Sequence, residues 1–537
     1  MTGAEAMLEG LSRENAEVVF GIPGVQIMEL LDSFYQSDKV RWITVRHEQT
    51  AAFMAFGYAR TTGKLGVAMV VPGPGALNSC AAVATAYAAS TPLLLLAGQI
   101  DTPNLGKDRG VLHDFSRQIE VFETMTKWNA RISSVAEIPE VLREAIHRLG
   151  VGRPRPIQLE IPFDLWATKD AVRFSPKPTT VTTKINQAEI TQASSMLAGA
   201  RRPVIWAGGG ATTSDAAKEL EQLAEALQAP VVMTPEGKGV ISSTHPLCAG
   251  AADLDSSPII ASADIILCIG SRLLNLQGSL AKMPARPKII QVDIDEEEVG
   301  RQCSVDLGIT ADARQTITGL LESLPDAKCS EWQTGEIDEI NKKFLEKMEN
   351  GAPIQFGIIQ DIRSELNEDA ILVPGITGLG YWSRYIYPVY KPRTYLTSSY
   401  FVTLGFAFPT ALGAKVGNPD KQVVALSGDG GFLYAVGDLA TAVKLDLNVV
   451  TIVFNDNVYG ATFKMQQRQY DNRIIGTDLL NPDFAALANS FGAVGMKLSG
   501  PEELKEALRS ALGEKGPVVI EVPIESMAHP WEIFRKG

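Results

Sequence analysis

Two short polar clusters in the last third of the sequence contain the residues best suited to chemistry. Asp429 follows the apolar run VVALSG and stands between two glycines, and Asn455 and Asp456 follow the apolar run TIVF. Glycines let backbone N–H groups approach an anion closely. Two oxygen-bearing side chains can hold a hard octahedral cation such as Mg²⁺, which would clamp a diphosphate against the glycine amides. We therefore predict a metal-bound diphosphate between these clusters.

A third candidate, Glu48, lies in the stretch RHEQTAAFMAFGYAR near the N-terminus. A short strand here leads into a helix of small apolar residues, which is a packed place for a carboxylate without an obvious cationic partner. A carboxylate in such surroundings suits proton exchange. The same position is also typical of a helix cap, so both roles remain open. We expect His47 beside it to be a structural residue at the helix start.

The elements that must position these residues alternate along the chain. Short runs rich in Val, Ile and Leu, such as VVFG, VAMVV and LLLLAG, are followed by glycine or proline turns and helical patterns. The same order returns in RRPVIWAGGGA and ADIILCIGSRL. This alternation predicts an α/β protein with parallel sheets covered on both faces. Because parallel strands end at one edge of a sheet, where ligands bind, Asp429 and Asp456 should lie together.

The length of the chain calls for more than one domain. At 537 residues it exceeds the size at which a single hydrophobic core stops growing. The stretch 165–184 is rich in Pro, Thr and Lys and is typical of a linker, and the charged stretch 329–350 is typical of a helix with its connections. We therefore predict three α/β units, at 1–168, 185–328 and 350–537.

Composition excludes several classes of protein. The net charge of −13 offers no basic surface for nucleic acid. The five cysteines have no CxxC spacing, so neither a zinc site nor a disulfide framework is indicated, and they are typical of a reducing compartment. The N-terminus lacks the pattern of a signal peptide, and the apolar region 67–98 is broken by prolines and glycines. We expect a cytoplasmic protein that contacts neither nucleic acid nor membrane.

The motif GDG, followed by NDNVYG, resembles the diphosphate motif of thiamine diphosphate enzymes. The chain is similar over essentially its whole length to the family of acetolactate synthase, benzoylformate decarboxylase and related decarboxylases and carboligases. The stretches that carry the resemblance, in the order of the family, include FGIPG, RHEQTAAFMAFGYAR, GPGALN, GKG, IIQVDID and GFAFPTALGAK. The resemblance implies three doubly wound parallel-sheet domains: a pyrimidine-binding N-terminal domain, a central Rossmann-like domain and a diphosphate-binding C-terminal domain.

The resemblance also implies roles for individual residues. Glu48 would hydrogen-bond the pyrimidine ring of thiamine diphosphate and so help the cofactor to deprotonate its own thiazolium C2; it is the residue expected to be catalytic. Asp429 and Asp456, with the carbonyl oxygen of Val458, would bind Mg²⁺. Leu404 would hold the cofactor in its bent shape. The other positions implied to line the cofactor are Thr377, Gly378, Val402, Gly428, Gly430, Gly431, Tyr459 and Gly460.

Departures from the family concern the substrate. Position 456 is Asp where the family mostly has Asn, which adds a negative charge to the metal site. Val71 stands near the place of a catalytic histidine in benzoylformate decarboxylase-like proteins, and Met465 matches a substrate-shaping tryptophan of acetolactate synthases. The loop LHDFSRQIEVF differs from the glutamine-bearing loop of the family, and Asp114 within it is a further candidate. The candidate pocket residues are Val25, Val71, His113, Gln118 and Met465. For His113 an ordinary loop position is expected, with proton transfer as the alternative.

The central domain shows no clear nucleotide signature. The stretch GSRLLNLQGS at 270–279 replaces the flavin segment that acetolactate synthases carry, and AGGGA at 207–211 lacks the spacing of GxGxxG. We therefore do not expect FAD, and nucleotide binding by this domain stays open.

We expect a thiamine diphosphate- and Mg²⁺-dependent enzyme that decarboxylates a small 2-oxo acid and joins the remainder to a second carbonyl, as acetolactate synthases do. The alternative among enzymes is a simple 2-oxo acid decarboxylase or aldehyde lyase. From another class, the chain could be a non-catalytic subunit or a nucleotide-binding regulatory protein, but a degenerate site should have lost Glu48, Asp429 or Leu404. The resemblance further implies a homodimer or homotetramer in which each site is shared between subunits.

Overall fold

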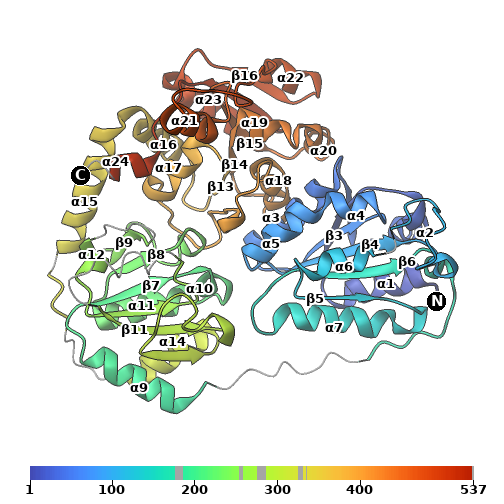
Figure 1. Cartoon of the computed structure of the whole chain (residues 1–537), viewed down its shortest axis with the longest axis horizontal. Helices are drawn as coiled ribbons and strands as arrows, with labels where there is room; N and C mark the ends of the chain where they lie inside the picture. The colour runs from blue at the N-terminus through green and yellow to red at the C-terminus, as the bar shows by residue number, and fades with distance from the viewer. Residues whose placement is uncertain are drawn as a thin grey trace. The chain divides into compact units, whose positions relative to one another are not determined.

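The strands of the computed structural model form three parallel sheets, one in each third of the chain (Figure 1). The structure describes residues 1–115, 117–175, 185–252, 258–274, 286–324, 330–333 and 335–534. Helices connect most consecutive strands of each sheet in the described ranges. The predicted α/β class with three parallel-sheet domains is therefore confirmed.

The first sheet has the described strand order β2 (Arg41–Thr44), β1 (Val18–Gly21), β3 (Gly66–Val70), β4 (Leu93–Gln99), β6 (Ile157–Pro162) and β5 (Trp128–Arg131). Helices α1 (Gly3–Arg13), α2 (Met28–Tyr35) and α7 (Ile138–Gly150) share one hydrophobic core with it. Helix α3 (Glu48–Thr62) contacts β1, β3, β4 and α5 (Cys80–Ala88). Nearly every side chain of α3 is buried, which agrees with its run of small apolar residues.

The last sheet has the described order β13 (Ile371–Pro374), β14 (Val423–Gly428), β15 (Val449–Asn455), β17 (Val518–Pro523) and β16 (Val494–Lys497). Helix α18 (Ala407–Gly417) packs closely on α3 of the first sheet. A Cβ atom on Gly57 would lie 2.0 Å from the carbonyl oxygen of Thr410, and one on Gly413 would lie 1.9 Å from that of Met54. Glycine at both positions therefore lets the two helix backbones touch.

The middle sheet has the described order β12 (Leu307–Thr310), β11 (Lys288–Asp293), β10 (Ile265–Ile269), β7 (Pro203–Ala207), β8 (Val231–Met233) and β9 (Cys248–Ala251). One core joins it to α9 (Gln187–Ala198), α11 (Ala217–Leu227) and α14 (Ala313–Ser323). The charged stretch after residue 329 forms α15 (Glu336–Gly351), as predicted, and is followed by α16 (Pro353–Glu365).

Shorter helices complete the described chain. They are α4 (Pro74–Asn78), α6 (Gln118–Glu123), α8 (Asp164–Ala167), α10 (Gly209–Thr213), α12 (Pro258–Ala261), α17 (Gly378–Ile386), α19 (Asp429–Leu433), α20 (Leu439–Lys444), α21 (Gly460–Gln469), α22 (Phe484–Ser490), α23 (Leu504–Leu512) and α24 (Pro530–Phe534). None of the helices in the described ranges is both long and apolar enough to cross a bilayer.

The chain groups into two compact units. The first comprises 1–179, 371–377 and 398–525, and the second comprises 180–370, 378–397 and 526–537. The first and last sheets thus belong to one unit. Of the predicted linker at 165–184, residues 176–184 lie outside the described residues, and the domain boundaries given above stay predictions.

Candidate active site

Asp429 stands directly after β14, at the edge of the last sheet. Strands β14 and β15 are parallel and in register, with Gly428 opposite Phe454, so Asp429 and Asn455 leave the sheet side by side. Asp429 is buried, and its Oδ1 accepts from the amide of Gly430 at 2.8 Å. Its Oδ2 accepts from the amide of Asn457 at 2.9 Å. The prediction that the two polar clusters meet at one sheet edge is therefore confirmed.

Asp456 is the less satisfied carboxylate of the two. Its Oδ1 accepts only a long hydrogen bond, from the amide of Val458 at 3.4 Å. Burial and the nearby charge of Asp429 raise the pKa of Asp456 to about 6, and the charge of Lys464 opposes this shift without cancelling it. Burial also raises the pKa of Asp429, against the hydrogen bonds that it accepts. Two carboxylates that the protein does not fully stabilise as anions fit a divalent cation between them.

The glycines and aromatic residue of the motif pack around this pair. A Cβ on Gly430 would lie 2.6 Å from the ring of Tyr459, and one on Gly460 would lie 3.4 Å from Oδ2 of Asp456. A Cβ on Gly428 would likewise lie 3.4 Å from the side chain of Thr377. The amide of Tyr459 donates to the carbonyl of Thr477 at 2.8 Å, which fixes the turn before α21.

The remaining cofactor-lining positions lie close by in sequence. Gly431 is in α19, and the helix α21 begins at Gly460 without a side-chain cap. The first N–H groups of such a helix have no partner within it and can receive an anion. Gly378 is the first residue of α17, which belongs to the second compact unit. The structure thus brings together Thr377, Gly428, Asp429, Gly430, Asp456, Tyr459 and Gly460.

Sequence reasoning missed two residues that hold this edge together. Asn481 donates to Oδ2 of Asp429 at 2.7 Å and to Oδ1 of Asn455 at 2.9 Å. The side-chain nitrogen of Asn455 in turn donates to Oε1 of Glu521 on β17 at 2.9 Å. Asn481 lies far along the chain in a loop of unremarkable composition, so no local signal marks it. Glu521 interrupts an apolar strand, which is a signal for a buried polar contact.

Glu48 is the first residue of α3, and it is not the residue that caps this helix. His47 is the N-cap, because its Nδ1 accepts from the amide of Gln49 at 3.1 Å. The half-buried Glu48 instead accepts from the side chain of Asn78 at 3.0 Å through Oε2. A Cβ on Gly75 would lie 3.4 Å from Oε1. Of the two roles left open, the N-cap role belongs to His47, and proton exchange by Glu48 stays a prediction.

The segment after η6 (Ser399–Phe401) contains Val402 and Leu404. Val402 is exposed and has a φ of 53°, a left-handed conformation that strains a β-branched residue by about 1–3 kcal/mol. Leu404 is half-buried. A Cβ on Gly405, which follows, would lie 3.4 Å from the side-chain nitrogen of Gln49. This segment therefore packs against the start of α3, next to Glu48.

The candidate pocket residues separate into two groups. Val71 is buried against Gly24 and Gly75, because a Cβ on either glycine would lie within 2.6 Å of its methyl groups. Val71 is thus close to the Glu48 end of the site. Val25 and Met465 are exposed, on η1 (Val25–Ile27) and α21.

His113 was expected to be an ordinary loop residue, but its ring is partly buried. His113 has a φ of 67°, and Nδ1 of its ring is buried without a hydrogen-bond partner. Oδ1 of Asp114 is likewise buried and unpartnered. Gln118 is fully buried, and its amide is engaged with the protein itself.

No hydrogen bond or ion pair joins Glu48 to Asp429 or Asp456 in the described part of the chain. The candidate site thus consists of two halves, one at the start of α3 and one after β14. A cofactor that uses both halves must therefore reach from one to the other.

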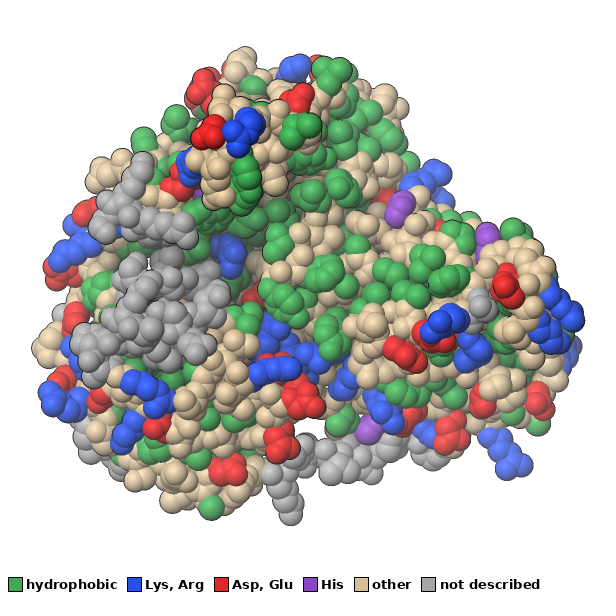
Figure 2. All heavy atoms as spheres, in the orientation of Figure 1, with side chains coloured by type: hydrophobic (Ala, Val, Ile, Leu, Met, Phe, Trp, Pro, Cys, Tyr) green, Lys and Arg blue, Asp and Glu red, His purple; other side chains and the backbone are tan. Residues whose placement is uncertain are grey.

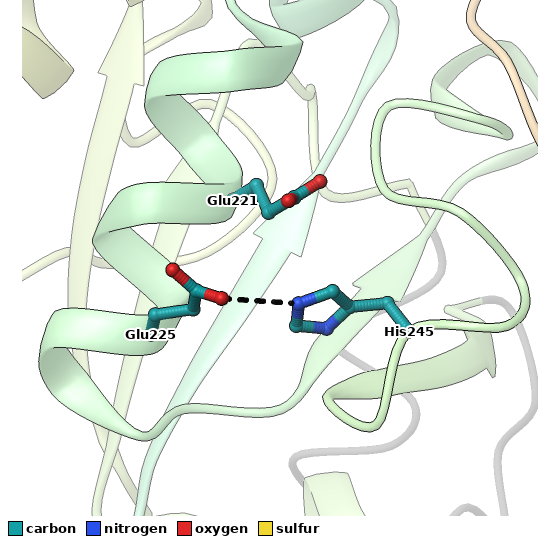
Figure 3. Close-up of side chains that lie close together, drawn as sticks. All are labelled: Glu221, Glu225 and His245. Carbon is teal, nitrogen blue, oxygen red and sulfur yellow. Dashed lines mark ion pairs between the residues drawn. The ribbon is translucent and has the colours of Figure 1, made fainter.

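Two other candidate sites in the second unit have structural explanations. Glu221, Glu225 and His245 lie together (Figure 3), with ligand atoms within 4.8 Å of one another. However, Nδ1 of His245 accepts from the amide of Leu247 at 3.1 Å, so the neutral ring carries its proton on Nε2, which faces Glu225 at 3.6 Å. To bind a metal through Nε2, the ring would need its proton on Nδ1 instead. We interpret this cluster as a surface contact between the Nε2 side of the histidine ring and a carboxylate, and not as a metal site.

The glycine run 207–211 also has a packing role. A Cβ on Gly208 would lie 2.2 Å from the carbonyl oxygen of Gly270, and one on Gly210 would lie 2.6 Å from its Cα. The glycines therefore let the turns after β7 and β10 touch. Of the stretch at 270–279, residues 275–279 lie outside the described residues, so the flavin expectation stays a prediction.

Comparison with known proteins agrees with this geometry. Three thiamine pyrophosphate enzyme models match the chain: the N-terminal TPP binding domain over 1–121, the central domain over 190–320 and the C-terminal TPP binding domain over 375–522. A probable acetolactate synthase large subunit of Methanocaldococcus jannaschii is 33% identical, over 98% of this chain and 92% of that protein. The acetolactate synthase large subunit of Corynebacterium glutamicum is 33% identical, over 100% and 89%. A probable 2-ketoarginine decarboxylase of Pseudomonas aeruginosa is 33% identical, over 97% and 94%. This chain therefore belongs to the thiamine pyrophosphate enzyme family.

Proposed function

We propose that the protein is a thiamine diphosphate- and Mg²⁺-dependent enzyme that decarboxylates a small 2-oxo acid and joins the remainder to a second carbonyl compound. The observation that carries the proposal is the pair of carboxylates after β14 and β15, the buried Asp429 and the half-buried Asp456, whose raised pKa values fit a bound cation. The acetolactate synthase names of several relatives support the carboligase reaction.

The residues of the chain divide the work between binding and proton transfer. Asp429, Asp456 and the carbonyl oxygen of Val458 would hold Mg²⁺, and the first amides of α21 would be available to the diphosphate. Asn78 holds Oε2 of Glu48, which leaves Oε1 to exchange a proton with the pyrimidine ring. When bound, thiamine diphosphate supplies the carbon that adds to the 2-oxo group and accepts the electron pair released with CO₂.

A simple 2-oxo acid decarboxylase is the second candidate. The relative from Pseudomonas aeruginosa that is named a probable 2-ketoarginine decarboxylase is as similar to this chain as the acetolactate synthases are. In that case the remainder of the substrate is protonated and released as an aldehyde. We propose no flavin for either reaction, because the segment expected to bind it is replaced at 270–279.

We further propose a cytoplasmic homodimer, or a pair of dimers, in which Glu48 of one chain and Asp429 of another serve one cofactor. Hydrophobic side chains lie exposed on the face shown in Figure 2. Exposed apolar residues also lie close in sequence to the two halves of the site and support a chain–chain contact there: Leu77 follows the Gly75 turn, Tyr400 and Phe401 precede Val402, Leu433 ends α19 and Tyr434 follows it. Exposed apolar residues of this kind are typical of protein interfaces.

A screen of 2-oxo acids with product identification tests the reaction. We expect CO₂ release that requires both thiamine diphosphate and Mg²⁺, and acetolactate from pyruvate. An aldehyde as the only product would select the decarboxylase instead. No cofactor-dependent CO₂ release from any 2-oxo acid would refute both and favour a non-catalytic role.

Thermal unfolding tests the metal site without turnover. Mg²⁺ and thiamine diphosphate together should raise Tm, since ligands that bind only the folded state stabilise it by mass action. The variant Asp429→Ala should abolish the shift. A shift that survives this substitution would place the cofactor elsewhere.

A further inference from the structure

Glu160 is a fully buried carboxylate that the proposed mechanism does not use. It lies on β6, within the first sheet, and its Oε2 accepts from Nε of Arg131 at 2.5 Å. Its Oε1 accepts from the side-chain amides of Gln99 at 2.9 Å and Gln118 at 2.8 Å. A charge this deeply buried needs such partners, and removing one leaves the others unsatisfied.

These contacts decide which way the amide of Gln118 points. Its nitrogen donates to Glu160 and, at 3.1 Å, to the carbonyl of Gly98. The amide group therefore cannot turn over without placing its oxygen against two acceptors. Its oxygen is left to accept from the backbone amide of Gly73 at 2.7 Å. The carboxylate of Glu160 thus fixes the orientation of the Gln118 side chain, whose oxygen accepts from the amide of Gly73.

Gly73 begins the turn that reaches Glu48. It has a φ of 61°, and a Cβ there would lie 2.9 Å from the carbonyl oxygen of His113, so the turn leaves no room for a side chain. Helix α4 starts at the next residue and ends at Asn78, which donates to Glu48 at 3.0 Å. A shift of Gly73 would therefore carry Gly75 and Asn78 away from the Glu48 carboxylate.

We propose that the ion pair of the buried Glu160 with the half-buried Arg131 acts through Gln118 and Gly73 as a positioning device for Glu48. The role assigned to Glu48 rests on the proposed function, but the hydrogen-bonded chain from Arg131 to Gly73 does not. Gln118, which we expected in the substrate pocket, is in this account a positioning residue. It touches the turn beside the catalytic carboxylate and not the substrate.

Hydrogen exchange on the cofactor-free protein tests the chain of contacts directly. In Glu160→Gln, one face of the new side chain must present an amide nitrogen either to Arg131 or to the two glutamine donors, so the network loses an acceptor. We expect the amide of Gly73 to exchange about tenfold faster than in the wild type. Mass spectrometry of peptides that cover 71–78 measures this rate.

A matched control comes from the same strand. Gln158 is fully buried, and neither polar atom of its amide has a hydrogen-bond partner. The isosteric Gln158→Met should therefore leave Gly73 exchange and turnover unchanged. Equal acceleration in Gln158→Met would show general loosening of the sheet and overturn the proposal, as would unchanged Gly73 exchange in Glu160→Gln.

Gln118→Met provides a second route if Glu160→Gln does not fold. It removes the acceptor of Gly73 but keeps the contacts of Glu160 with Arg131 and Gln99. The same acceleration of Gly73 exchange is expected. Normal protection of Gly73 in this variant would overturn the proposal.

Kinetics of the loaded enzyme separate positioning from substrate contact. Glu160→Gln and Gln118→Met should both lower kcat, by about a hundredfold, with KM for the 2-oxo acid unchanged. A rise in KM in Gln118→Met alone would make Gln118 a substrate ligand and overturn its assigned role. If the wild type turns over no 2-oxo acid, the proposed function fails. The hydrogen-exchange result still shows whether Glu160 and Gln118 hold the amide of Gly73.

Discussion

At the scale of single residues, the metal half of the site contains an electrostatic conflict. The fold places the carboxylates of Asp429 and Asp456 at one sheet edge. Asp429 accepts most of the hydrogen bonds that the protein donates to this pair. Burial and the charge of Asp429 raise the pKa of Asp456 to about 6. A carboxyl whose pKa is raised by folding is more easily ionised in the unfolded chain, so its ionised form opposes folding at neutral pH.

The first prediction follows from this sign. Without metal at pH 7, Asp456→Asn should raise the free energy of unfolding by about 1 kcal/mol, after allowance for solvent screening. The gain should shrink at pH 5, where Asp456 is mostly protonated. Urea denaturation at both pH values measures it. Asp471→Asn, at an exposed position, is the control. A variant less stable than the wild type at pH 7 would contradict the assignment.

A second prediction concerns proton exchange. Glu48→Gln keeps an oxygen for Asn78 but cannot exchange a proton, so turnover should fall by about 10²–10⁴-fold. The thermal shift with Mg²⁺ and thiamine diphosphate should remain, because the metal ligands are untouched. Steady-state kinetics and thermal unfolding measure the two effects. Near-normal kcat would refute the catalytic role of Glu48.

Sequence reasoning could find these residues because each stands where a strand ends or a helix begins. Asp429 and Asp456 follow apolar runs that form strands, and Glu48 precedes one that forms a helix. Asn481 could not be found in this way, since its bond to Asp429 joins positions 52 residues apart. Gln118 was identified as a candidate, but its direction depends on the buried Glu160, which only the fold brings to it.

At the scale of elements, the turn between β2 and α3 is tied to the last sheet. The backbone amide of Arg46, two residues before Glu48, donates to the buried Asp438 at 2.8 Å. Thr441 donates to the same carboxylate at 2.8 Å. Asp438 lies in η7 (Val436–Asp438), shortly after α19, so one side chain links the turn before Glu48 to the segment that follows α19.

The third prediction tests this link. Asp438→Ala leaves the amide of Arg46 without its acceptor, which should lower the free energy of unfolding by about 1–3 kcal/mol. Urea denaturation measures the loss. Asp420→Ala, at an exposed turn position, should leave the free energy of unfolding unchanged and serves as the control. An unchanged midpoint in Asp438→Ala would show that the turn is held by other contacts.

The pattern of apolar runs predicted which elements form, because each buried strand of a parallel sheet needs a continuous run. It could not predict that α3 and α18 would touch through Gly57 and Gly413. That contact depends on two helices that are far apart in the sequence, and nothing local to either helix identifies its partner.

At the scale of the whole molecule, the three sheets were predictable from length and alternation, but their grouping was not. The first and last sheets form one compact unit, and α16, α17 and the described C-terminal residues after 525 belong to the unit of the middle sheet. Within the first unit, the hydrogen bonds of Glu48 and those of Asp429 form separate clusters. One cofactor that uses both therefore has to bridge two clusters, either within one chain or, as proposed, between two.

The central claim, that Glu48 and the Asp429/Asp456 pair of different chains serve one cofactor, is tested most directly by complementation. Glu48→Gln and Asp456→Ala chains, each nearly inactive alone, are unfolded, mixed in equal amounts and refolded together. Random pairing makes about half of the dimers mixed, and each mixed dimer has one site with both residues intact. Activity should therefore return to about a quarter of the wild-type value. If both residues act within one chain, every site keeps one lesion and no activity returns, which would contradict the shared site.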